Sequence, residues 1–455
     1  MFVHHAFGLL LTLALSSAGR PSRLQARLAT PCDIPPELVD MCLRALADDK
    51  ASLKSASLVC RRWWSCARRY MFDSVALTAV DRDGACLLPF LQHDRWPLRS
   101  LVKELHLRNQ NQDVNLLTSL SVDDLARLIS SCPGVEVLRF THVRWIRARD
   151  QAMPLWPCFP RVRTLELTYR DSQAVPDLTS IFYWLPCVQE FIFNGGMLGR
   201  LESFDRFSPF ARPLLLPPNL RLESCHLRSH EMDRYLLDYL QDTQTMQSLQ
   251  SFSAVVTTVD EDFIAIGRII QAASGTLRHV SLDLSSHKLS TRMYQRSHIL
   301  TSARFSLGAC TRLESLHLTM LLYMPRENAA QNSVHFDAAG RQVDEIVRTV
   351  ASDAFTSLTF ELVGSATRET ELGTLHAYGW GELDAFLATH PTLRTVAWRW
   401  KAGWSDSLMT YLVKRMLPLT SMHRKLRIQP SVERPALRRS DLFHSNVTFP
   451  EPKSY

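Results

Sequence analysis

The chain has 455 residues, 46% of them hydrophobic and 21% charged, with a formal net charge of +7. This composition is typical of a folded protein and argues against bulk disorder, while the length exceeds the roughly 100–200 residues of one ordinary domain, so we expect several domains or a repeat array. The positive charges are scattered and no recognition motif accompanies them, so we expect no nucleic-acid partner.

The N-terminus is apolar over residues 6–18 and ends in small residues, as the hydrophobic region of a signal peptide does. This stretch is shorter than the about 20 apolar residues that a membrane span needs, so we expect no membrane anchor. The flank before it contains two histidines and no lysine or arginine. We therefore favour an incidental leader, with secretion as the alternative. Together with an arginine-rich linker it makes up residues 1–30.

A first helix is predicted directly after this linker. Pro35 and Pro36 suit its first turn, where a missing N–H costs little. Apolar residues at helical spacing then form one stripe, which consists of Leu38, Met41, Cys42, Ala45 and Leu46.

A second helix is predicted from Leu53 to about Phe72. Leu58 and Val59 lie off its apolar stripe, so this helix either kinks or has a second partner. The stripe itself consists of Leu53, Ala56, Cys60, Trp63, Trp64 and Ala67.

Short segments with alternating apolar residues recur after Phe72, roughly 26 to 36 residues apart where they are clear, and most fit L-x-x-L-x-L with substitutions. Turns and amphipathic stretches precede several of them, so we predict a repeated unit of helix, turn and short strand. The asparagine that follows the strand in tight leucine-rich repeats is mostly missing. The predicted strands include residues 105–107, 135–140, 162–167, 188–193, 249–254, 277–284, 313–318, 358–362 and 393–398, and the predicted helices are 122–131, 178–185, 263–273, 343–350 and 383–389.

The rest of the repeat region is predicted to be less regular. Residues 195–219 and 323–341 interrupt the rhythm and are expected to be long loops. We place the repeat domain at residues 78–420 and expect the basic residues 421–455 to form a loosely ordered tail.

Two blocks within residues 34–72 resemble the F-box. The first is Ile34-Pro35-Pro36-Glu37-Leu38-Val39-Asp40, and the second is Leu53 with Ala56-Ser57-Leu58-Val59-Cys60-Arg61-Arg62-Trp63, ending at Tyr70-Met71-Phe72. They look most like the version common in fungal multigene families, and the repeat region resembles leucine-rich-repeat F-box proteins more loosely. The resemblance implies an α/β protein: a small all-α F-box over residues 31–77, followed by a leucine-rich-repeat-like solenoid with a strand layer and helices.

The resemblance also implies a function in ubiquitin-dependent protein degradation. It implies that the chain is a non-catalytic substrate receptor of an SCF (Skp–cullin–F-box) E3 ubiquitin ligase, as F-box proteins are, and that it acts in the cytoplasm or nucleus. The F-box would dock the adaptor subunit, and through it a cullin, while the repeats would bind a target protein of unknown identity and bring its lysines close to the ubiquitin-charged enzyme. The candidate adaptor-binding residues are Ile34, Pro35, Pro36, Leu38, Leu43, Leu53, Leu58, Val59 and Trp63.

Several of these residues have two interpretations. Trp63 is expected to pack the helices together, with an adaptor contact as the alternative. Trp398 and Trp400 share one face of a predicted strand and, with Trp404, form either terminal core or a target-binding aromatic patch. The arginines of the second block form a solvated face or complement an acidic adaptor; they are Arg61, Arg62, Arg68 and Arg69.

No pattern of an enzyme or of a cofactor site is found. The sequence lacks H-E-x-x-H, the P-loop, G-x-S-x-G and a dinucleotide-binding glycine pattern, so we expect no catalysis, cofactor or metal. His226 and His230 have the spacing of two ligands on one helix, without a third beside them. The acidic residues from Asp260 to Asp262 are expected to begin a helix. The ten cysteines include no Cys-x-x-Cys pair, which indicates a reduced, intracellular chain.

Two other functions stay open. A secreted or surface leucine-rich-repeat binding module is suggested by the apolar leader and the acceptor triplet Asn446-Val447-Thr448. Caps of extracellular repeats usually carry paired cysteines, and none are clustered here. A third function is a scaffold that binds the adaptor subunit outside a ligase. Its sequence features would be the same as those of a ligase substrate receptor.

Overall fold

The computed structural model describes residues 34–79, 99–109, 119–146, 159–169, 181–182, 184–195, 219–228, 240, 244–256, 260–285, 306–321, 343–363, 380–400 and 405–428. The chain is a mixed α/β protein with a twelve-stranded sheet and helices. It divides into two compact units, Met1–Glu166 and Leu167–Tyr455. The predicted leader, the interiors of both predicted loops and all residues after 428 lie outside the described ranges. Within those ranges no helix has the length and apolarity to cross a membrane.

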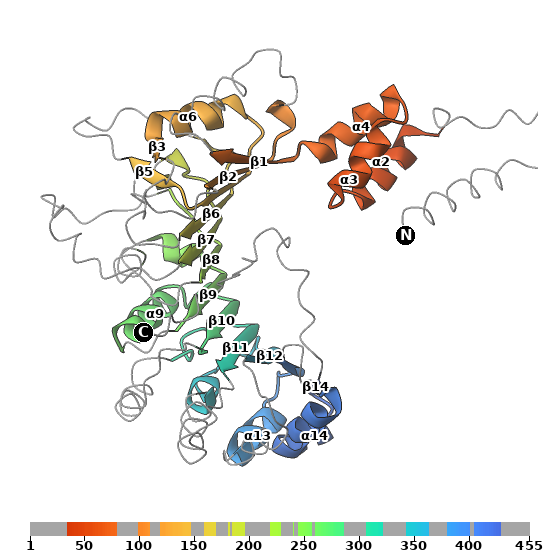
Figure 1. Ribbon diagram of the computed structural model, residues 1–455. Helices are drawn as coiled ribbons and strands as arrows, with labels where there is room; N and C mark the ends of the chain where they lie inside the picture. Colours follow the sequence, from red (N-terminus) through yellow and green to blue (C-terminus); the bar gives the residue numbers. More distant parts are fainter. Residues whose placement is uncertain are drawn as a thin grey trace, which may run out of the picture. The chain divides into compact units, whose positions relative to one another are not determined.

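The first unit begins with three helices, α2 (Pro36–Ala45), α3 (Lys50–Ser57) and α4 (Arg61–Met71), which we call the helical module (Figure 1). Helix α2 starts at a proline, as predicted, and Asp49 caps α3 by accepting a hydrogen bond from the Ser52 amide at 3.0 Å. The module has its own core, built from Val39, Leu43, Leu53, Trp63 and Ala67.

The structure corrects the predicted second helix, which is two helices. Leu58 ends α3, and Cys60 precedes α4 in an extended conformation, with φ −163° and ψ 170°. Of the two interpretations of the off-stripe residues, the break is the one observed: Leu58 and Val59 lie in the turn between the helices. The turn removes them from any helical face.

The buried face of α2 also differs from the predicted stripe. Val39 and Leu43 are fully buried, whereas Leu38 and Met41 are 44% and 66% exposed. Both sets have helical spacing, and the packing of α4 against α2 selects the first. The predicted apolar stripe therefore points partly to solvent.

The sheet follows chain order from β1 to β14, apart from β3 (Ser119–Ser121) and β5 (Arg144–Ile146), which pair with each other. Strands β1 and β2 pair in parallel, as do β2 and β4. Every neighbouring pair from β7 to β14 is parallel as well. The other strands are β1 (Ser74–Ala79), β2 (Glu104–Asn109), β4 (Val137–Thr141), β6 (Thr164–Tyr169), β7 (Glu190–Gly195), β8 (Ser224–Leu227), β9 (Ser251–Val255), β10 (His279–Asp283), β11 (Ser315–Leu321), β12 (Ser357–Val363), β13 (Thr395–Trp400) and β14 (Leu426–Ile428).

All of the predicted strand segments are confirmed, as β2, β4, β6, β7 and β9 to β13. Buried and partly exposed residues alternate along β4, β6, β7, β8 and β12, so one sheet face packs on the core and the other is polar. Strands β1, β8 and β14 were not predicted, and because β1 begins at Ser74 the predicted F-box limit at residue 77 falls inside a strand.

Helices occupy connections between the strands, because parallel neighbours need a crossover. Helix α6 (Val122–Ser131) has the predicted bounds, and α9 (Asp260–Ala272) and α13 (Trp380–Thr389) begin a few residues earlier than predicted. Residues 181–182, 184 and 343–348 are helical inside two further predicted helices. The start of α9 at Asp260 agrees with the predicted role of the acidic cluster.

Hydroxyl groups join consecutive repeated segments of the second unit, just before each strand. Each hydroxyl belongs to the residue just before the apolar residue that begins a repeated segment. It donates to the backbone carbonyl of the apolar residue that begins the preceding segment. The three bonds are Ser248 Oγ to Leu222 O at 3.0 Å, Thr276 Oγ1 to Leu249 O at 2.9 Å and Thr392 Oγ1 to Phe355 O at 2.9 Å.

The C-terminal end of the sheet extends beyond the predicted domain limit at residue 420. Helix α14 (Asp406–Met416) buries an apolar face, α15 (Pro418–Met422) follows, and β14 adds the last strand beside β13. The prediction of a loosely ordered tail was therefore wrong for residues 421–428, whose ordering depends on contacts with α13 and β13. Residues 429–455 lie outside the described ranges.

Candidate functional site

The most distinctive surface feature of the helical module is a group of exposed apolar side chains. Leu58 is 81% exposed, although its neighbours in the module form a closed core. Large apolar side chains that stay exposed on a folded unit are typical of a binding surface. We call this group the apolar set: Leu38, Met41, Leu58, Val59 and Trp64.

The structure separates the predicted adaptor-binding residues into surface and core. Leu38, Leu58 and Val59 belong to the apolar set, Pro35 is exposed, and Ile34 and Pro36 are half-buried. Leu43, Leu53 and Trp63 form the core instead, which corrects their assignment as contact residues and confirms the structural interpretation of Trp63. Met41 and Trp64 were missed as surface residues because their helical spacing matched a core stripe.

Polar contacts hold the ends of the module together beneath this surface. Lys50, at the start of α3, donates to the Tyr70 carbonyl near the end of α4 and forms an ion pair with Asp73 at 2.9 Å. Ring centroids of Trp64 and Phe72 lie 6.5 Å apart in an edge-to-face arrangement. These contacts join α3, α4 and the start of β1 and so fix the geometry from which the apolar set projects.

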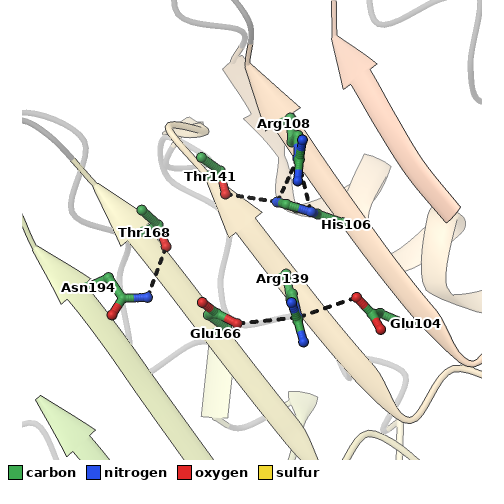
Figure 2. Close-up of polar contacts among 8 residues, drawn as sticks. All are labelled: Glu104, His106, Arg108, Arg139, Thr141, Glu166, Thr168 and Asn194. Atoms are coloured by element: carbon green, nitrogen blue, oxygen red, sulfur yellow. Dashed lines mark hydrogen bonds and ion pairs between the residues drawn. The ribbon is translucent and has the colours of Figure 1, made fainter. Parts of the chain in front are cut away.

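A second candidate surface is the polar face of the sheet. In the first unit, Arg139 of β4 lies between Glu104 of β2 and Glu166 of β6, with Nε 3.4 Å and 3.3 Å from the two carboxylates (Figure 2). The Nε–H is aligned with neither carboxylate well enough to form a hydrogen bond. The charges alternate across the three strands: negative on β2, positive on β4 and negative on β6.

His106 lies beside this series, between Thr141 and Arg108 (Figure 2). Arg108 Nε lies 3.1 Å from His106 Nδ1 and 3.3 Å from His106 Nε2, and His106 Nε2 lies 2.8 Å from Thr141 Oγ1. Burial, together with the charges of Arg108 and Arg139, lowers the pKa of His106 to about 3. The ring is therefore neutral at physiological pH and serves as a hydrogen-bonding support for Arg108.

The second unit continues the polar face with serine, threonine and histidine. Figure 2 also shows Asn194 of β7 donating to Thr168 of β6 at 3.2 Å. Further along, each histidine contacts a hydroxyl or a carboxylate of its own or a neighbouring strand. These contacts are Ser224 Oγ to His226 Nε2 at 2.8 Å, His226 Nε2 to Glu190 Oε1 at 3.8 Å, and His279 Nδ1 to Ser315 Oγ at 2.8 Å.

Ser281, His317 and Glu361 form a line across β10, β11 and β12 that invites comparison with a hydrolytic triad. Ser281 Oγ is 3.5 Å from His317 Nδ1, which is too long for an activated nucleophile, and His317 Nε2 is 3.1 Å from Glu361 without an aligned hydrogen bond. The three side chains contact one another on the polar face of the sheet.

The structure also corrects two other predicted sites, the tryptophan patch and the histidine pair. Trp398 and Trp400 are 0% and 1% exposed, so they form terminal core and the surface-patch alternative is wrong for both; Trp404 lies outside the described residues. His226 lies on strand β8, so the helical spacing assumed for a metal pair does not apply, and His230 lies outside the described residues. Within the described ranges no three metal-ligating side chains are grouped.

The described cysteines are all free thiols. Burial raises the pKa of the Cys225 thiol to about 12 and the pKa values of Cys132 and Cys310 to about 11. A thiol that stays protonated is neither a nucleophile nor a metal ligand. These three cysteines therefore serve as small apolar core residues.

No protein-family model matches the chain, and no curated protein matches it.

Proposed function

We propose that the chain is a non-catalytic substrate receptor of an SCF-type ubiquitin ligase, in which the helical module docks the adaptor subunit and the sheet region binds the target. The observation that carries this proposal is the apolar set on a module whose core is already complete. A side chain such as Leu58, at 81% exposed, contributes little to the stability of the module itself. A protein partner that covers it would remove that apolar area from water.

The module favours a protein partner over a lipid surface. Its apolar side chains come from three places in the sequence: Leu38 and Met41 on α2, Leu58 and Val59 in the turn after α3, and Trp64 on α4. Such a divided set suits a shaped protein surface, because an amphipathic helix that lies on a membrane presents one continuous apolar face. The F-box-like blocks of the sequence contain these same positions, apart from Met41 and Trp64.

For the sheet region we infer a leucine-rich-repeat-like solenoid that binds the target protein. The strand order along the chain, the helices between strands and the hydroxyl bonds between consecutive segments support this inference. The polar sheet face is the favoured binding surface, because its histidine, serine and carboxylate groups hold one another in place before a partner arrives.

The test is binding of the full chain to a purified adaptor subunit by calorimetry. We expect Leu58→Asp and Leu38→Asp each to weaken binding about thirtyfold, which corresponds to about 2 kcal/mol for a central contact. Met422→Asp is the matched control, because Met422 is 75% exposed on α15 and remote in sequence from the module. It should change the affinity less than about twofold.

The outcomes separate the candidate functions. Absence of binding by the folded wild-type chain, or equal losses for Leu58→Asp and Met422→Asp, would remove the support for adaptor docking. Adaptor binding without ubiquitin transfer to any captured protein in a reconstituted ligase would favour a scaffold. The secreted alternative would be supported by wild-type protein that is recovered from culture medium after cleavage near residue 18.

A further inference from the structure

Helix α4 presents a strongly basic face to solvent. Its sequence RRWWSCARRYM contains four arginines and no acidic residue. Arg61, Arg62 and Arg69 are exposed, and Arg68 is half-buried with an Nε that has no hydrogen-bond partner. Such a concentration of like charge along one short helix is unfavourable unless an anion compensates it.

Ser65 lies at the centre of these arginines. Its side chain is exposed, and its hydroxyl donates to the carbonyl of Arg61 at 3.0 Å. Residues three and four apart are neighbours on a helix surface, at about 5–6 Å between their Cβ atoms. Counting from Ser65, all four of these positions are arginine: Arg61, Arg62, Arg68 and Arg69.

We propose that Ser65 is a phosphorylation site whose phosphate is held by the arginines around it. In the reaction, Ser65 Oγ attacks the γ-phosphorus of ATP in a protein kinase, its proton passes to the base of the kinase, and the bond to ADP breaks. The arginines on the N-terminal side suit a kinase with an acidic substrate groove. The phosphoserine carries about −1.5 to −2 charges and three acceptor oxygens, so it forms charge-assisted hydrogen bonds with guanidinium groups on both sides.

The modification changes both the stability of α4 and its charge. The arginines that repel one another in the unmodified chain each gain a neighbouring anion, so the helix becomes more stable. The charge of the α4 side chains falls from +4 to about +2. The lower charge weakens the attraction of α4 for an acidic adaptor. This consequence alone depends on the proposed docking function.

The first test places phosphoserine at position 65 of the full chain during translation and measures amide hydrogen exchange of residues 61–71. We expect exchange about fivefold slower than in the unmodified chain, and no slowing when Arg61→Gln and Arg69→Gln are also present. Ser55 gives the matched control. It is exposed on α3 and donates to the carbonyl four residues before it, as Ser65 does, but no arginine is three or four residues away. Phosphoserine at 55 should not slow exchange in α3.

The second test incubates the native full chain with ATP and a protein kinase that prefers arginine before the acceptor serine, followed by mass spectrometry. Phosphate on Ser65, absent in Ser65→Ala, supports the proposal. Phosphate on Ser65 only after unfolding in urea would overturn it, because the helix would then shield the hydroxyl. If the amides of α4 exchanged as fast as in the unmodified chain, or faster, with phosphoserine at position 65, the proposed contacts between the phosphate and the arginines would be refuted. Neither readout involves the adaptor, so failure here is distinct from failure of the docking proposal.

Discussion

Replacing Asp384 with alanine is expected to destabilise the C-terminal end of the sheet. Asp384 lies on α13 and is 1% exposed. Its carboxylate accepts hydrogen bonds from the amides of Leu419 and Thr420 at 2.7 Å and 2.8 Å and from the Thr420 hydroxyl at 2.6 Å. These bonds join α15 to α13, and β14 follows α15 directly in the chain.

The magnitude follows from the groups that lose their partner. The alanine variant leaves two amides without an acceptor and leaves the fully buried Thr420 hydroxyl only the backbone carbonyl of residue 384, at 3.5 Å. A buried polar group without a partner costs about 1–3 kcal/mol, so we expect a loss of about 3–5 kcal/mol in the free energy of unfolding. Asp384→Asn retains one carbonyl oxygen and should lose about half as much.

The assay is urea unfolding followed by tryptophan fluorescence, together with amide exchange of residues 419–428. Glu382→Ala is the control, because Glu382 lies on the same helix with the same charge but is 81% exposed where it pairs with Arg348. It should cost less than about 0.5 kcal/mol. Equal unfolding midpoints for Asp384→Ala and Glu382→Ala would refute the reasoning.

Three further outcomes are expected. Thr276→Val, which removes a hydroxyl bond between consecutive segments, should lower the free energy of unfolding by about 1 kcal/mol, whereas Thr389→Val, which loses only exposed bonds within its own helix, should change it less. Because the folded pKa of His106 is about 3, the folded chain stays unprotonated there while the unfolded chain binds the proton below about pH 6.5. Stability should therefore fall as pH falls from 6.5 toward 3, by at most about 1.4 kcal/mol per pH unit, and His106→Gln should make the dependence in urea titrations shallower. Iodoacetamide labelling with mass spectrometry should modify exposed Cys187 in the native chain and leave Cys225 unmodified; labelling of both would contradict the burial.

Some features of the fold were readable from the sequence because their signal is local. An apolar side chain at every second residue predicts a strand with one buried face, and this pattern located β4 and β12 correctly. Helix α6 was predicted with its observed bounds, because its amphipathic period is clear and a Cys-Pro-Gly turn follows it. Strand β8 was missed because Ser-Cys-His-Leu has only four residues, although polar and apolar residues alternate in it.

The candidate docking surface was only partly predictable. Leu38 and Met41 are three residues apart and Val39 and Leu43 are four apart, and both spacings put a pair on one helix face, so periodicity alone does not show which pair faces inward. The break between α3 and α4 was one of two interpretations, and it decides that Leu58 lies in a turn. Met41 and Trp64 are exposed for the same reason: the neighbouring helices bury other side chains.

The sequence by itself determined most of the strands, the apolar core face of the sheet and the basic character of α4, because these depend on residues close together in the chain. Only the tertiary structure decided which face of each helix is buried and which polar groups meet. Arg139 contacts Glu104 and Glu166, and Asp384 binds Thr420, across chain separations that no local pattern encodes. Such pairs form because stacked parallel strands and packed helices bring distant residues into register, where a charge or a buried amide must find a partner.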